Sequence, residues 1–136
     1  MVLARELMTP ADPLSDDATV AEAARHLAAS PFDAVPVCDS EGRLRGVVTD
    51  RDLVVEVAAA GKLSSETRMI DLVRGEVVSV RADDDLEKVA TTMRDYRTPR
   101  VPVLDGDRVV GMLSRSDVAG LLPDGLFGTA HPRTDV

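Results

Sequence analysis

The chain contains stretches in which apolar residues recur at helical spacing, and short runs that are mostly apolar. The same succession of stretches and runs occurs twice. After Thr19-x-x-Glu22, which has the form of a capping box, apolar residues recur every three to four positions, as in a helix with one buried face. Two valine-rich runs follow, separated by a polar turn that contains Gly42, as in a hairpin. A further helical stretch ends at Gly61, a residue suited to a left-handed cap. The first half therefore predicts a helix over 19–30, strands over 34–38 and 44–48, and a helix over 50–60.

The second half of the chain repeats this order. The run 35–37 (VPV) recurs 66 residues later as 101–103, and Gly46 recurs 65 residues later as Gly111. A short extended piece precedes the first helix of each copy, so that the repeated unit is β-α-β-β-α and the fold class is α+β. A copy of about sixty residues is too small to bury a strong core alone, so we expect the two copies to pack on each other. The second copy predicts a helix over 86–96, strands over 100–104 and 108–113, and a helix over 115–122.

This periodicity divides the chain into four segments. Residues 1–61 form the first repeat, 62–70 a linker, 71–122 the second repeat and 123–136 a flexible tail.

Composition excludes several classes of protein. The 136 residues carry a formal charge of -8 and include no Trp, one Tyr and two Phe, so the core must be aliphatic. Nucleic-acid binding needs clustered cations or aromatic stacking platforms, and both are missing. No apolar run is long enough to span a membrane, and the first residues lack the apolar segment of a signal peptide. The lone Cys38 and the scattered His26 and His131 offer no metal site, so we expect a cytoplasmic protein without bound metal.

One motif occurs in both copies where a strand is followed by a helix. It reads GVVTDRD over 46–52 and GMLSRSD over 111–117. Its plain interpretation is structural, since a hydroxyl at the helix start and a carboxylate three residues later cap the helix. The same groups also suit a nucleotide: the hydroxyl can donate to a phosphate, and the carboxylate can accept the hydroxyl groups of a ribose. The duplication of the motif after matching hairpins favours this second interpretation.

With these repeats, strands and motifs, the chain resembles a tandem pair of CBS domains, also called a Bateman module, over residues 3–122. As a stand-alone CBS pair, the chain is similar to small actinobacterial stress-response CBS proteins. The resemblance implies two β-α-β-β-α repeats packed by pseudo-two-fold symmetry, and a homodimer of such pairs. It also implies a cleft that binds an adenosyl ligand such as AMP, ADP, ATP or S-adenosylmethionine, as a regulatory ligand and not as a catalytic cofactor.

The resemblance assigns a ligand-binding role to residues of both motifs, with the Asp on the ribose, the Thr or Ser toward phosphate and an apolar residue against the base. It also assigns a phosphate contact to the residue that precedes the second Val-Pro-Val strand. The first copy has Ala34 at the equivalent position. It implies no catalytic and no metal-binding residue. The predicted ligand contacts are Val47, Thr49, Arg51 and Asp52 in the first site, and Arg100, Met112, Ser114, Ser116 and Asp117 in the second.

Three functions stay open at the level of sequence. The first is a regulatory module that senses an adenosyl ligand and acts in trans on a partner protein. The second is a ligand-free dimeric scaffold whose clefts are filled by its own side chains. The third is an enzyme, which we place last because no nucleophile and base pair or metal constellation is visible. Residues 1–66 carry 6 basic and 12 acidic side chains and residues 67–136 carry 10 and 12, so we expect the second cleft to bind phosphorylated ligands more tightly.

Overall fold

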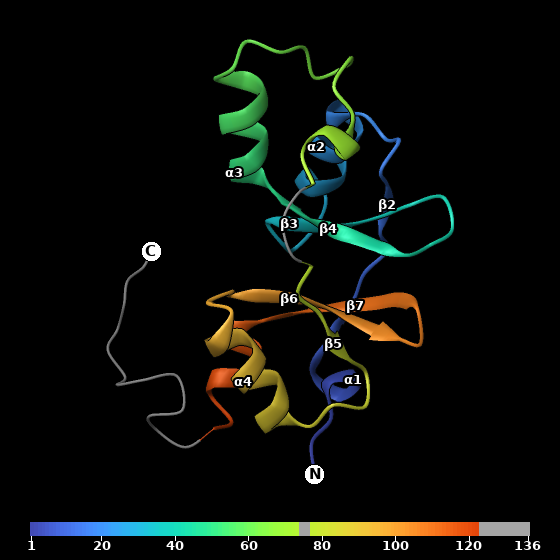
Figure 1. Cartoon of the computed structure of the whole chain (residues 1–136). Coiled ribbons are helices and arrows are strands. Elements are labelled where there is room, and N and C mark those ends of the chain that lie inside the picture. The colour runs from blue at the N-terminus through green and yellow to red at the C-terminus, as the bar shows by residue number, and fades with distance from the viewer. Residues whose placement is uncertain (74–76, 123–136) are drawn as a thin grey trace. The chain divides into compact units, whose positions relative to one another are not determined.

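The helices and strands of the computed structural model follow the predicted order and confirm the α+β class (Figure 1). The structure describes residues 1–73 and 77–122. The chain divides into two units. We call them the first-repeat unit, which is Ala11–Val77 with Asp107–Val109, and the second-repeat unit, which is Met1–Pro10, Val78–Gly106 and Val110–Val136.

The first-repeat unit has a three-stranded sheet in the order β2-β3-β4. Strand β2 runs parallel to β3, and β3 pairs with β4 as the predicted antiparallel hairpin, with Val35 opposite Val48. All five residues of β3 are buried, which explains its continuous apolar sequence. The elements are β2 (Leu14–Ser15), α2 (Val20–Ala28), β3 (Ala34–Cys38), β4 (Leu44–Thr49), α3 (Asp50–Leu53), a π-helical segment (Val54–Ala58) and a 3₁₀ turn (Met69–Asp71).

The capping box predicted at the start of α2 is present. The N–H of Glu22 donates to Thr19 Oγ1 at 3.2 Å, and the N–H of Thr19 donates to Glu22 Oε1 at 2.9 Å. The hydrogen bonds from Thr19 hold the pKa of the Glu22 carboxyl below its ordinary value. With its start fixed, α2 turns one apolar face to the sheet. The aliphatic core of this unit is Val20, Ala23, Val35, Val37, Val48, Val57, Met69 and Leu72.

The predicted linker contributes to this core. Met69 is fully buried, and its N–H donates to the carbonyl of Ala18 at 2.9 Å. The N–H of Val20, at the start of α2, donates to the carbonyl of Thr67 at 2.8 Å. This segment therefore covers one end of the first repeat as well as connecting the copies.

The second-repeat unit has a four-stranded sheet in the order β1-β7-β6-β5. Strand β5 is parallel to β6, as β2 is to β3, so the short extended pieces predicted before each first helix are confirmed. Its core is again aliphatic, with Val89, Val101, Val103 and Leu113 among the fully buried side chains. The elements are α1 (Ala4–Leu7), β1 (Thr9–Pro10), β5 (Val80–Arg81), α4 (Leu86–Asp95), β6 (Arg100–Asp105), β7 (Arg108–Ser114) and α5 (Arg115–Ala119).

The first ten residues pack with the second repeat, which periodicity gave no reason to expect. The N–H of Ala4 donates to the carbonyl of Asp84 at 2.8 Å, and β1 pairs antiparallel with β7, with Thr9 opposite Met112. The predicted division of the sequence into two repeats, a linker and a tail stays a prediction. Its segments are 1–61, 62–70, 71–122 and 123–136, and the last of them lies outside the described residues.

The last helix of each repeat differs in length or type from the predicted one. The helix expected over 50–60 is α-helical only to Leu53 and then becomes π-helical, with the N–H of Ala59 donating to the carbonyl of Val54 at 2.8 Å. Apolar periodicity cannot distinguish the two forms, because each buries one face. Gly61 does adopt the expected left-handed conformation, with φ +75°. The helix expected over 115–122 ends at Ala119, where Gly120 follows as a poor helix former.

Candidate functional site

The first motif lies where β4 is followed by α3. Thr49 is the N-cap of α3 and has extended backbone angles. The N–H of Asp52 donates to Thr49 Oγ1 at 3.1 Å, and the N–H of Thr49 donates to Asp52 Oδ2 at 2.8 Å. Both side chains are half-buried, whereas Arg51 is exposed. The structural capping role of this motif is thus real, and a ligand role would use the same two side chains.

The second motif caps its helix differently. The N–H of Ser114 donates to Asp117 Oδ2 at 2.8 Å, which matches the first motif. The Ser114 hydroxyl, however, donates to the same Oδ2 at 2.9 Å and lies 2.9 Å from the Ser116 hydroxyl. The second motif therefore presents a hydroxyl pair beside the carboxylate, where the first presents a single threonine.

In each motif one carboxylate oxygen is committed to the helix and the other is not. Oδ2 of Asp52 and of Asp117 accepts the hydrogen bonds given above. Oδ1 of either residue makes no hydrogen bond with the part of the chain that the structure describes. A carboxylate oxygen with unused lone pairs can accept the hydroxyl groups of a ribose.

The loop before each Val-Pro-Val strand lies against the motif of its own repeat. The N–H of Asp50 donates to the carbonyl of Asp33 at 2.9 Å, and the N–H of Arg115 donates to the carbonyl of Pro99 at 2.7 Å. In the second-repeat unit this bond brings the segment that contains Arg100 to the segment that contains Ser114 and Asp117. The hairpin predicted for strands 100–104 and 108–113 already implies this proximity, because the two strands of a hairpin place its ends side by side.

The two residues predicted to face an adenine base differ in burial. Val47 is half-buried on β4, and Met112 on β7 is fully buried. A ligand could reach Val47 at the surface of its strand, whereas contact with Met112 needs the base to reach the edge of the core. The ligand roles of the predicted residues stay predictions.

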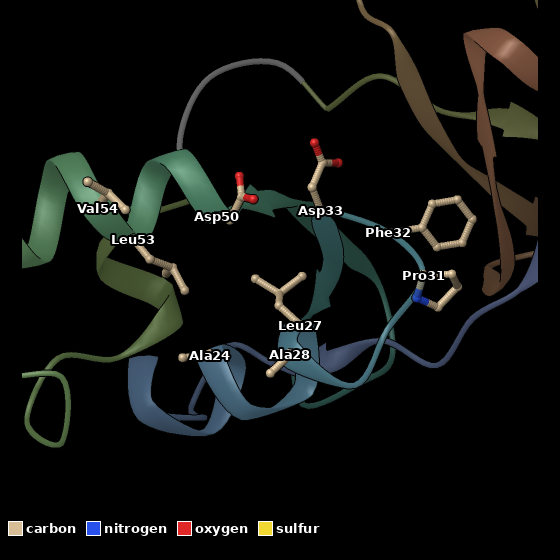
Figure 2. Close-up of a pocket in the computed structure, with 9 residues that line it drawn as sticks. All are labelled: Ala24, Leu27, Ala28, Pro31, Phe32, Asp33, Asp50, Leu53 and Val54. Carbon is tan, nitrogen blue, oxygen red and sulfur yellow. The ribbon is translucent and has the colours of Figure 1, made fainter.

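A pocket of about 530 Å³ lies between α2 and α3 of the first-repeat unit (Figure 2). Leu27 and Leu53 project into the space between the two helices, and the carboxylates of Asp33 and Asp50 lie along one edge (Figure 2). Of the first motif, only Asp50 lines it, so the pocket does not coincide with the predicted ligand contacts. Sequence reasoning did not find this pocket. Its lining is Ala24, Leu27, Ala28, Pro31, Phe32, Asp33, Asp50, Leu53 and Val54.

Cys38, the only cysteine, ends β3 and is 5% exposed, so the thiol lies in the core of the first-repeat unit. Burial raises the pKa of the Cys38 thiol, and the nearby carboxylates of Asp39 and Asp16 raise it further. We therefore expect the native protein to react with a thiol-specific disulfide reagent at pH 8 roughly 100-fold more slowly than the unfolded chain. Equal rates in buffer and in denaturant would contradict this expectation.

Within residues 1–73 and 77–122, no three His, Cys, Asp or Glu side chains are grouped so as to hold a metal ion. No helix in this part of the chain is long and apolar enough to cross a membrane.

Comparison with known proteins identifies a family and several relatives. The model of the CBS domain matches twice, at residues 4–59 and 69–124. Hypoxic response protein 1 from Mycobacterium tuberculosis is 30% identical over 125 residues, which are 91% of this chain and 87% of that protein. A crystal structure of Hypoxic Response Protein I with two coordinated zinc ions is similar, with a TM-score of 0.79 and 28% identity, covering 90% of this chain and 100% of that one.

Two similar structures contain nucleosides or nucleotides. The cytosolic domain of the Mg²⁺ channel MgtE in complex with ATP is 35% identical, with a TM-score of 0.74, covering 89% of this chain and 49% of that one. The CBS domain pair of protein MJ0100 in complex with 5′-methylthioadenosine and S-adenosyl-L-methionine is 25% identical, with a TM-score of 0.72, covering 89% of this chain and 95% of that one.

Proposed function

Since the chain belongs to the CBS-domain family and is a CBS-pair regulatory module, we propose that it binds an adenosyl ligand and acts in trans on a partner protein. The ligand classes are those of the sequence prediction: AMP, ADP, ATP or S-adenosylmethionine. The ATP and S-adenosyl-L-methionine complexes of the similar structures support this choice. We also propose that the protein is cytoplasmic, binds no nucleic acid and is not an enzyme.

One observation carries the proposal. Each repeat places a half-buried aspartate beside a hydroxyl at the start of its last helix, with one carboxylate oxygen held by the backbone and the other unused among the described residues. Holding one oxygen fixes the direction of the other, so the acceptor for ribose hydroxyl groups is preorganised.

A thermal-shift screen of the wild-type protein tests the function. A ligand that binds only the folded state raises the melting temperature by mass action. Millimolar AMP, ADP, ATP and S-adenosylmethionine are compared with inorganic phosphate and adenine at the same concentration. A rise with at least one adenosyl compound, larger than with either control, supports the proposal. No rise with any of them favours the ligand-free scaffold, and steady turnover of a nucleotide favours an enzyme.

We expect the two sites to differ in affinity for phosphorylated ligands. The second-repeat site has Arg100, Arg115 and two serine hydroxyls near its aspartate, whereas the first has the buried Ala34 and the acidic Asp33. By calorimetry with ATP, Asp117→Ala should therefore reduce the measured affinity more than Asp52→Ala does. A larger loss from Asp52→Ala would show that this ranking is wrong.

We further propose a homodimer. The side chains of Val54 and Val55 on the last helix of the first repeat are 60% and 48% exposed, and Val54 lines the apolar pocket of Figure 2. A second copy that covers these side chains removes apolar surface from water. By light scattering after size exclusion, Val54→Asp should shift the protein toward the monomer. Leu63→Asp, at an exposed position outside the pocket, should not, and a wild-type monomer would exclude the dimer.

A further inference from the structure

The pocket between α2 and α3 of the first-repeat unit leaves apolar side chains in contact with solvent (Figure 2). Ala24, Ala28 and Val54 are exposed, and Leu27 and Leu53 are half-buried. Single exposed apolar residues are ordinary, but several that line one pocket mark a surface that another molecule covers. The volume of about 530 Å³ is large enough for a whole aromatic side chain.

A π-helical turn forms part of this surface. After Leu53 the helix widens, and the N–H of Ala59 donates to the carbonyl of Val54, five residues earlier, at 2.8 Å. Val57 belongs to the core and is 2% exposed, whereas Val54 is 60% exposed. Because π-helical turns are uncommon and often lie at functional sites, this turn favours a binding role for the surface.

One edge of the pocket is acidic. The carboxylates of Asp33 and Asp50 lie there, and both residues are exposed (Figure 2). Opposite charges across an interface favour association and fix which surfaces meet. An occupant that suits this pocket therefore presents a large apolar or aromatic group with a cation beside it.

The second-repeat unit of the same chain presents such a pair at the turn between α4 and β6. Tyr96, the only tyrosine, is 54% exposed, and Arg97 beside it is also exposed. No hydrogen bond or ion pair joins the Arg97 side chain to residues 1–73 or 77–122. Tyrosine and arginine are enriched among the residues that contribute most to binding at protein interfaces.

Backbone geometry holds this turn in one conformation. Arg97 has φ +52°, the left-handed conformation that commonly follows a helix end. The N–H of Thr98 donates to the carbonyl of Met93 at 3.0 Å, and the Thr98 hydroxyl donates to the carbonyl of Arg100 at 2.8 Å. These bonds fix the turn on both sides of Arg97, so docking costs little conformational entropy of the backbone.

Each half of this match occurs in one repeat only. The positions equivalent to Tyr96, Arg97, Asp33 and Asp50 hold, in that order, Ser30, Pro31, Pro99 and Arg115. Two first-repeat pockets that faced each other would bring carboxylates together. A first-repeat pocket that faces the second-repeat turn of another copy brings a carboxylate to a guanidinium group instead.

We propose that the turn between α4 and β6 of one copy docks in the first-repeat pocket of a second copy, with the Tyr96 ring between α2 and α3 and the Arg97 guanidinium beside Asp50. The guanidinium group suits a carboxylate because it offers paired N–H donors. The copies are then joined head to tail, and the same contact made in both directions closes a dimer. This inference rests on the proposed homodimer and adds which surfaces form it.

Charge reversal tests which surfaces meet, with the dimer dissociation constant of the full chain measured by sedimentation equilibrium without ligand. In a head-to-tail dimer, Arg97→Glu or Asp50→Arg alone creates a like-charged pair at both contacts, so each should weaken self-association about tenfold. An equimolar mixture of the two variants restores opposite charges at both contacts and should return the constant to within about threefold of wild type. Arg81→Glu, at an exposed position elsewhere in the second-repeat unit, should leave it within about twofold.

The aromatic contact is tested separately. Tyr96→Ala removes the ring from both contacts and should weaken the dimer roughly thirtyfold, whereas Tyr96→Phe keeps the ring and should stay within about threefold of wild type. Leu121→Ala is the control, because Leu121 is a 55% exposed apolar residue of the same unit outside the turn. It should dimerise as wild type does.

The outcomes separate this inference from the homodimer on which it rests. If wild type is a dimer and the variants associate as tightly as wild type, the homodimer stands and docking of the turn is wrong. Charge variants that weaken the dimer singly but are not restored by mixing would also overturn the docking. Restoration by mixing would support it and show that both variants are folded. If wild type is a monomer, the proposed homodimer fails, this inference fails with it, and the pocket has an occupant other than a second copy.

Discussion

The double variant Asp52→Ala, Asp117→Ala is expected to lose the stabilisation that an adenosyl ligand gives to the wild-type protein. At a ligand concentration one hundred times Kd, binding to the folded state alone stabilises it by about 2.7 kcal/mol. For a chain of this size that raises the melting temperature by roughly 8 °C. Removal of both carboxylates deletes the ribose acceptor in each repeat, so the rise measured with ligand should fall to less than about 1 °C.

Each substitution also removes a helix cap, and this effect must be separated from ligand binding. The N–H groups of Thr49 and Ser114 lose their acceptors, at a cost of about 1 kcal/mol each. The quantity to compare is therefore the difference between melting temperatures with and without ligand, measured for each variant. Asp85→Ala is the matched control, because Asp85 caps α4 by accepting from the N–H of Lys88 at 2.9 Å and belongs to neither motif. It should lower the melting temperature and keep the full ligand shift.

A ligand shift that persists in the double variant would mean that the two motifs are caps and nothing more. Loss of the shift in Asp85→Ala as well would mean that any weakened helix start abolishes binding, and the assignment to Asp52 and Asp117 would fail.

Gly111→Ala is expected to destabilise the protein by about 1–3 kcal/mol, which lowers the melting temperature by roughly 3–10 °C. A Cβ at position 111 would lie 2.8 Å from the carbonyl oxygen of Thr9 and 2.6 Å from Met8 Sδ. The methionine side chain can move, but the Thr9 oxygen belongs to the backbone of β1, which pairs with β7 at this point. Relief of the clash therefore requires β1 to separate from β7.

Gly46→Ala is the matched control within the same chain, since Gly46 has the equivalent place in the first motif. A Cβ there would meet Val73 Cγ1 at 3.3 Å, a side-chain contact that a shift of a few tenths of an ångström relieves. We expect a change below about 1 kcal/mol. Chemical denaturation of both variants, with the midpoint and slope compared with wild type, measures the difference. Equal losses at the two positions would show that the pairing of β1 with β7 contributes nothing.

Much of the fold follows from local pattern. The capping box of Thr19 and Glu22, the two valine-rich hairpins and the left-handed Gly61 all occur as predicted, because each depends on residues within a few positions of one another. The register of the repeats also located both motifs at the start of a helix. By contrast, the exact ends of the last helices depend on competing hydrogen bonds of similar energy, and the pattern misjudged them.

The sequence by itself determined the duplicated β-α-β-β-α unit, the aliphatic cores and the positions of Asp52 and Asp117, since periodicity and capping are local. Only the tertiary structure decided that the first ten residues pack with the second repeat, and that Gly111 faces a backbone oxygen while the equivalent Gly46 faces a valine. These are contacts between segments far apart in the chain, which two copies of one local pattern can form differently.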